Sequence, residues 1–108
     1  MTEILVIQTG TQATVILGEK LVASNVPVLK SEMKRLIEAG VSSILLDCVH
    51  LELMDSTGIG CLVAAHNSLA KLNGSLSMLQ VSADIYELLC SMRLDRRINT
   101  ISLAATRD

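Results

Sequence analysis

The chain has 108 residues, half of them hydrophobic, and its nine basic and eleven acidic side chains leave a formal net charge of −2. The charges are scattered and Tyr86 is the only aromatic residue, whereas nucleic-acid binding requires a basic patch and single strands require aromatic stacking surfaces. No apolar run approaches the roughly 20 residues that span a bilayer, and the N-terminus has no basic leader, so we expect one cytoplasmic domain over 1–108 without direct membrane insertion.

Two short β-rich runs come first, EILVIQ at 3–8 and ATVIL at 13–17, and the polar TGTQ between them predicts a hairpin. The next segment, 23–40, is predicted to be a helix that starts at Ser24 or Asn25 and stops at Gly40. Its apolar side chains recur with helical spacing and are expected to face the core: Val26, Leu29, Met33, Leu36 and Ile37.

The remaining elements alternate between strand and helix. A continuous apolar run fits a strand that is buried on both faces, and it is followed by two further helix–strand pairs. The predicted elements are a strand at 42–48, a helix at 58–72, a strand at 75–81, a helix at 82–94 with Ser82 as cap and Met92 on its apolar stripe, and a strand at 98–104. This order predicts an α/β domain with a mixed, mostly parallel sheet of four to five strands, an N-terminal hairpin and about three amphipathic helices.

The segment LELMDSTGIGCLV at 51–63 differs from ordinary core sequence. One N-cap residue is enough to begin a helix, but here Asp55, Ser56 and Thr57 follow one another. Gly58 and Gly60 come next, although a glycine inside a helix costs about 1 kcal/mol relative to alanine. Two glycines in the opening turns predict that some group approaches the helix backbone closely. The corner is therefore either a plain helix cap or a hydroxyl presented for modification, because the positive end of a helix tolerates a phosphate.

Catalytic interpretations of this corner are incomplete. The serine-hydrolase elbow G-x-S-x-G keeps only its second glycine here, and the spacing aims neither His50 nor His66 at Ser56. The three cysteines form no CxxC pair and are expected to be free thiols. The sequence holds no nucleotide-binding glycine motif and no clustered metal ligands, so we predict no enzymatic activity, no cofactor and no metal.

The segment 44–82 resembles the centre of a STAS domain, and in particular the small free-standing anti-sigma factor antagonists of bacteria. The matching features are a strand that ends in Asp47, a spacer, and the motif DSTGIG at 55–60, followed by a helix, an Asn-Gly turn and a strand. The resemblance covers essentially the whole chain, since 88–98 is similar to the closing helix of that family and its turn into the last strand.

The resemblance implies a regulatory switch without catalytic power of its own. It implies that the unmodified antagonist binds an anti-sigma factor, which is often also a serine kinase, and so releases a sigma factor. The kinase phosphorylates the antagonist and a PP2C-type phosphatase restores it. Carried over by position, Ser56 is the phosphoacceptor, Thr57 is the second choice, and Asp55 shapes recognition by the kinase. Together with these residues, Gly58 and Ile59 would form the surface that contacts the partner.

The sequence departs from that family just before its first helix. Many antagonists carry an acidic residue in this turn, whereas GEKLVAS at 18–24 has only Glu19, slightly earlier. The identity of the partner therefore stays open, as does the oligomeric state. A second hypothesis is a cytosolic STAS subunit that docks onto a lipid-transport ATP-binding cassette complex in a membrane, without need of phosphorylation.

Overall fold

The computed structural model describes residues 4–102 and begins with the predicted hairpin. In it, β1 (Leu5–Thr9) pairs antiparallel with β2 (Gln12–Ile16). Gly10 makes the turn with a φ of +61°, a conformation that glycine adopts without steric cost. Val15 on β2 is fully buried, which fixes the face of the hairpin that meets the core. The hairpin prediction is confirmed.

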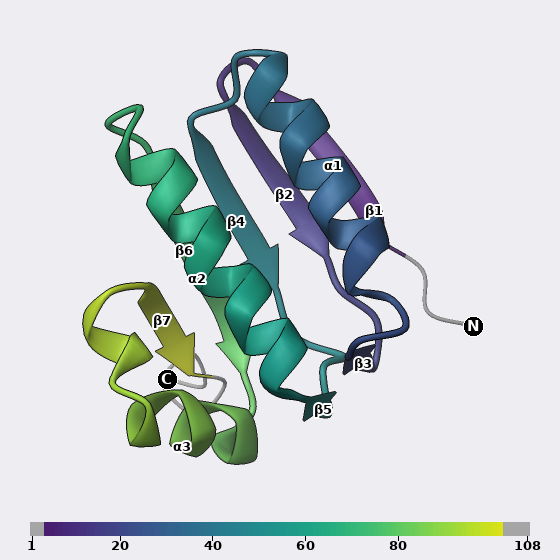
Figure 1. Ribbon diagram of the computed structural model, residues 1–108, viewed down its shortest axis with the longest axis vertical. Helices are drawn as coiled ribbons and strands as arrows, with labels where there is room; N and C mark the ends of the chain where they lie inside the picture. The colour runs from purple at the N-terminus through teal and green to yellow at the C-terminus, as the bar shows by residue number, and fades with distance from the viewer. Residues whose placement is uncertain (1–3, 103–108) are drawn as a thin grey trace.

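Three parallel strands extend the sheet from β2. They are β4 (Ser43–Asp47), β6 (Ser75–Val81) and β7 (Asn99–Ser102), and the strand order is β1-β2-β4-β6-β7. A helix lies in each connection between parallel neighbours, as the alternation of strands and helices predicts. The structure confirms an α/β domain with a mixed, mostly parallel sheet (Figure 1). The last two residues of the predicted final strand, 103 and 104, lie outside the described residues.

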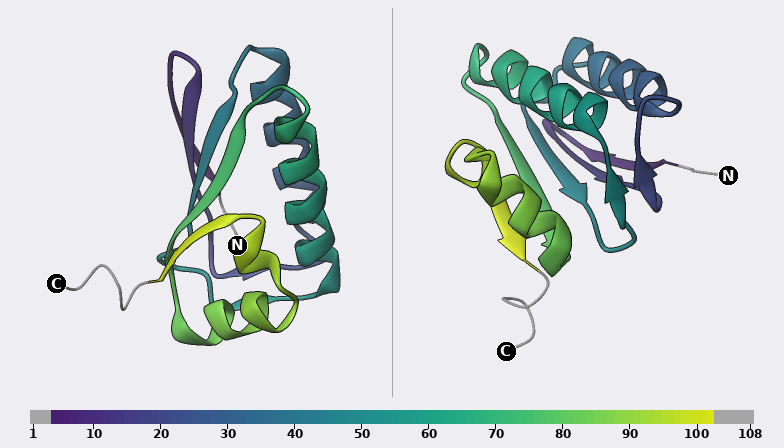
Figure 2. Two further views of the ribbon diagram at one scale, coloured as in Figure 1. Left: turned by 90° about the vertical axis from the view of Figure 1, so that its left-hand side faces the viewer. Right: turned by 60° about the horizontal axis from the view of Figure 1, so that its bottom comes forward.

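Two helices, α1 (Val26–Glu38) and α2 (Ser56–Ala70), lie side by side over one face of the sheet (Figures 1 and 2). The start of α2 differs from the prediction. The helix begins at Ser56 instead of Gly58, because Asp55 is its N-cap. Over residues 4–102 the structure contains no helix with the length and apolar character needed to cross a membrane.

The third helix, α3 (Ala83–Ser91), packs at the end of the sheet (Figure 2). Its predicted cap is confirmed, since the Ser82 hydroxyl accepts the N–H of Ile85 at 3.3 Å. The prediction that Met92 faces the core is wrong, because the helix ends before it and its side chain is 49% exposed. The chain turns there into a short 3-10 helix, η1 (Leu94–Arg96).

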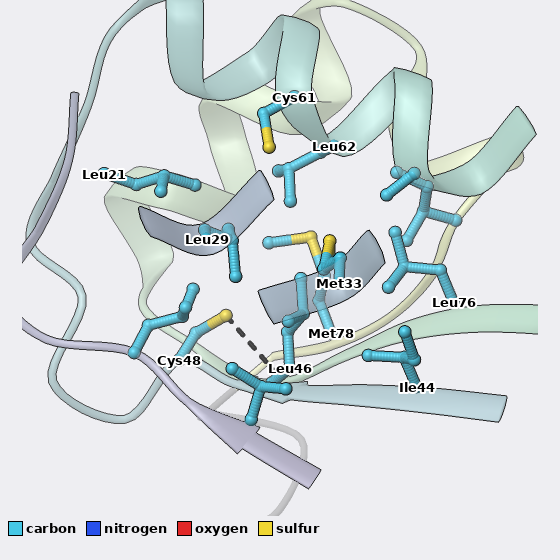
Figure 3. Close-up of a cluster of buried hydrophobic side chains, with 14 of the residues drawn as sticks. Leu21, Leu29, Met33, Ile44, Leu46, Cys48, Cys61, Leu62, Leu76 and Met78 are labelled. Carbon is cyan, nitrogen blue, oxygen red and sulfur yellow. Dashed lines mark hydrogen bonds between the residues drawn. The ribbon is translucent and has the colours of Figure 1, made fainter. Parts of the chain in front are cut away.

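The core fills the space between the helices and the sheet (Figure 3). Leu29 of α1, Leu62 of α2, Leu46 of β4 and Met78 of β6 are all completely buried there. Burial of one such side chain is worth about 2 kcal/mol, so this layer holds both helices against the sheet. The predicted apolar stripe of α1 is buried except for Ile37, which is half-buried.

A second, two-stranded parallel sheet was not predicted from the sequence. It pairs β3 (Lys20–Leu21) with β5 (Leu53–Met54), and both strands are too short to show a periodic pattern. The Glu19 carbonyl extends the pairing by accepting the N–H groups of Glu52 and Leu53 at 2.8 and 3.1 Å. Figure 1 shows this small sheet at the end of the domain where α2 begins. It joins the segment before α1 to the segment before α2.

Candidate functional site

Asp55 caps α2 and also joins two segments that are distant in the sequence. Its backbone is extended, with φ −102° and ψ −177°. Oδ1 accepts the N–H of Gly58 at 2.9 Å, and Oδ2 accepts the N–H of Ala23 at 3.0 Å. Its own N–H donates to the carbonyl of Leu21 at 3.3 Å. The predicted helix cap is confirmed, and the bond to Ala23 ties the loop before α1 to the start of α2.

These hydrogen bonds keep Asp55 ionised. The N–H of Gly58 and, after it, that of Ala23 lower the pKa of Asp55 below its ordinary value, because both bonds favour the charged carboxylate. The folded chain thus binds this proton less readily than the unfolded chain. The resulting stabilisation is fully present above the unfolded-state pKa and is lost as the pH falls through the lowered, folded-state pKa.

An Asp55→Asn variant should therefore be less stable than the parent chain at neutral pH. Asparagine can still accept the N–H of Gly58 as a cap, but it has no charge and no titration. The gap in the free energy of unfolding between the two chains should narrow as the pH falls below about 4, where unfolded aspartate takes up its proton. Urea denaturation at several pH values measures this gap, and a constant gap would contradict the assigned role of the charge.

Ser56 and Thr57 form the first turn of α2, and both are exposed. The first N–H groups of a helix have no acceptor within it, so this end carries a partial positive charge. The Ser56 hydroxyl is next to the ionised Asp55 in the chain and accessible from solution. A phosphate attached there would be partly compensated by the helix while remaining on the surface.

Gly58 and Ile59, by contrast, lie beneath this surface. Ile59 is only 8% exposed and belongs to the core. A Cβ on Gly58 would collide with the backbone carbonyl oxygen of Leu21 and would lie 2.9 Å from Cγ of Met54. The glycine therefore allows α2 to start directly against β3 and β5. These two motif residues position the surface and offer little of their own to a partner in the free chain.

Gly60 has no such neighbour. It is exposed, and a Cβ built on it would have nothing within 4 Å. The sequence predicts a close approach to the helix at both glycines. At Gly58 the approaching group is Leu21 of the same chain, whereas no described residue of this chain approaches Gly60. An alanine at this position would favour the helix by about 1 kcal/mol. The glycine leaves the α2 backbone open to the outside.

The loop before α1 lies against the start of α2. This turn stands out in the sequence for its missing acidic residue, but its contact with Asp55 was not predicted. Ala23 and Ser24 are exposed beside Asp55. Asn25 shapes the loop, since its Oδ1 accepts the N–H of Val22 at 2.8 Å and its Nδ2 donates to the carbonyl of Lys20 at 2.7 Å. Asn25 is the N-cap residue of α1 by position, as predicted, but its side chain makes no cap bond. An Asn just before a helix was the available sign of this turn.

Two acidic residues flank β5, the strand that leads into α2. Glu19 and Glu52 are exposed, and a backbone bond of 2.8 Å between them places both beside β5. His66 is half-buried on α2, and His50 is exposed in the loop after β4. Burial, with the nearby Asp47 carboxylate, raises the pKa of the Cys48 thiol to about 12, so this thiol stays protonated.

Comparison with known proteins extends this description. A family model described as STAS domain matches residues 4–106. No protein of curated function matches the sequence. Among solved structures, a candidate anti-sigma factor antagonist from Thermotoga maritima superposes with a TM-score of 0.85 at 17% identity, covering 92% of this chain and 86% of its own. An anti-sigma factor antagonist from Mycobacterium paratuberculosis gives 0.82 at 18% identity, covering 100% and 96%.

A third similar protein is the anti-sigma factor antagonist SpoIIAA of Bacillus. Its unphosphorylated form has a TM-score of 0.71 at 17% identity and covers 89% of this chain and 96% of its own. Its phosphorylated form gives 0.73 at 17% identity, with 93% and 90% covered. At these identities the likeness concerns the fold: the arrangement of strands and helices is shared.

Proposed function

Because this chain belongs to the STAS domain family, we propose that it is a phosphorylation-switched anti-sigma factor antagonist of a bacterial cytoplasm, formed by 1–108 as one domain. Unmodified, it binds an anti-sigma factor that is also a serine kinase, and so releases a sigma factor. The observation that carries the proposal is the exposed hydroxyl of Ser56 at the capped start of α2, beside the ionised Asp55. SpoIIAA, which shares this fold, exists in unphosphorylated and phosphorylated forms.

The chain itself supplies a surface and an acceptor, while the kinase supplies the chemistry. Ser56 Oγ forms a bond to the γ-phosphorus of ATP, the bond from that phosphorus to the β–γ bridging oxygen breaks, and ADP leaves with its electron pair. A base of the kinase takes the hydroxyl proton. A PP2C-type phosphatase returns the serine by hydrolysis of the O–P bond. Asp55 holds the serine at the helix start, and no catalytic group of this chain is needed.

Docking of the unmodified form uses the surface around Ser56 and Thr57, whose hydroxyls are uncharged. Phosphorylation adds a charge of about −1.5 to −2 and three acceptor oxygens. At the start of α2 this charge joins that of Asp55, and the exposed Glu19 and Glu52 flank β5, the strand that leads into the helix. To bind the phosphorylated form, an interface that fits a hydroxyl would have to strip water from the dianion and place it against partner groups that do not compensate its charge. The complex is therefore destabilised while the fold, whose helix end partly compensates the charge, is kept.

Incubation with the anti-sigma factor kinase of the same organism and ATP should place one phosphate on each chain, at Ser56. Peptide mass spectrometry locates it. Thr57→Ala should be modified as the parent chain is, whereas Ser56→Ala should stay unmodified. Equal modification of Ser56→Ala would disprove the assignment, and loss confined to Thr57→Ala would move the acceptor to Thr57. Stable binding to a transport ATPase without phosphorylation would favour the docking subunit instead.

A further inference from the structure

A groove of about 480 Å³ runs between α1 and α2 on their outer surface. Met33 and Cys61 form its floor, and both are buried. Ala64 and Ser68 of α2 form one wall and are exposed. The other wall belongs to α1. Figure 2 shows the two helices in one layer over the sheet, so whatever enters the groove lies across both helices on the side away from the strands.

The α2 wall allows a close approach. From Ser56 to Ala70 this helix has no charged residue, and Gly60, Ala64 and Ser68 follow one another along its exposed side with spacings of four. Two helices pack with their axes about 8–10 Å apart, and the side chains at the contact decide the distance. A groove with one wall this small fits the ridge of another helix.

The α1 wall carries two lysines and, towards the end of the helix, the exposed Glu38, so its net charge is positive by one. Lys30 and Lys34 line the groove one helical turn apart, and both are exposed. Lys30 and the buried Cys61 line the same groove, and the positive charge of Lys30 opposes the larger effect of burial, which raises the pKa of the Cys61 thiol. Within 4–102 neither lysine is part of an ion pair, whereas Arg35 on the same helix is paired with Glu32 at 2.9 Å. Two free cations beside an apolar floor are complementary to an acidic amphipathic surface.

We propose that this groove receives an acidic amphipathic helix of the anti-sigma factor kinase, which rests on the proposed function. The apolar side of that helix covers Met33 and Cys61, and its carboxylates meet Lys30 and Lys34. The surface is continuous with the phosphorylation site, because α2 carries Ser56 at its start and the groove wall two turns later. A phosphate on Ser56 would then lie close to an acidic element and repel it.

Charge reversal in the groove tests this proposal. The double variant Lys30→Glu/Lys34→Glu should bind the purified kinase about tenfold more weakly at low salt, and the difference from the parent chain should shrink as salt screens it. The matched control Lys71→Glu/Arg96→Glu changes the same number of exposed charges outside the groove and should bind like the parent. Calorimetry with the kinase that modifies Ser56 gives both affinities. Tighter binding of the groove variant would show a basic partner and overturn the proposal.

Filling the groove gives a second readout that does not depend on charge. Ala64→Trp should weaken the complex by about tenfold or more, because it occupies the space that the partner helix needs. Ala70→Trp, exposed on the same helix outside the groove, should not. If both groove variants bind like the parent while phosphorylation of Ser56 still releases the kinase, the groove is not the docking site and the proposed function stands. If the unmodified parent does not bind the kinase at all, the proposed function fails and the groove assignment falls with it.

Discussion

The chain phosphorylated at Ser56 is expected to bind the anti-sigma factor kinase at least about 100-fold more weakly than the unmodified chain, which corresponds to about 3 kcal/mol. The phosphate places a dianion beside Asp55, on the surface that we propose the partner covers when Ser56 is unmodified. Ser56→Asp adds a single negative charge and should reproduce the effect in part. Calorimetry or surface plasmon resonance with the purified kinase measures all three chains.

The matched control for this experiment is Asn67→Asp. It adds one negative charge to an exposed position on the same helix but far from its capped end, so the affinity should stay within about twofold of the parent, as for an isolated surface charge. Circular dichroism should show an unchanged fold for Ser56→Asp, because a negative charge suits a helix start. Equal affinity of the phosphorylated and unmodified chains would contradict the switch.

The long elements could be predicted because each carries its own pattern. The alternation on β2 and the helical spacing on α1 reflect local periodicity, which does not depend on distant parts of the chain. Strands β3 and β5 have only two residues each. They are stabilised by pairing with each other although they lie far apart in the sequence. The start of α2 was misplaced for a similar reason. Any of three consecutive residues could cap the helix. Asp55 is the one that does, and it also accepts a tertiary hydrogen bond from the N–H of Ala23, which local sequence does not reveal.

The site was predictable as a motif and not as a surface. The resemblance predicts the acceptor at Ser56, and three successive cap residues followed by two glycines mark this corner as unusual without any resemblance. Which of these residues point outward depends on β3, an element that the sequence did not reveal. Leu21 on that strand lies against Gly58, while Gly60, only two residues later, faces outward. The same residue type therefore has two physical roles in one helical turn.

A Gly58→Ala variant is expected to lose about 2 kcal/mol of the free energy of unfolding, as for overpacking of a tight contact. The added methyl group would collide with the carbonyl oxygen of Leu21 and approach the side chain of Met54. Because the same Leu21 carbonyl oxygen also accepts the N–H of Asp55, it cannot move without disturbing the cap residue. Urea denaturation monitored by circular dichroism gives the difference in stability.

The matched control is Gly60→Ala, in the same helix and with the same added methyl group. Open space surrounds this position, so helix propensity decides the outcome and the variant should gain up to about 1 kcal/mol. If the two variants changed stability equally, the contact between Gly58 and Leu21 would not be the reason for the first glycine. Since a partner that uses the open backbone would meet the new methyl group, Gly60→Ala should also weaken the complex with the kinase while stabilising the free chain. This opposite effect on folding and on binding is what separates a glycine kept for a partner from one kept for the fold.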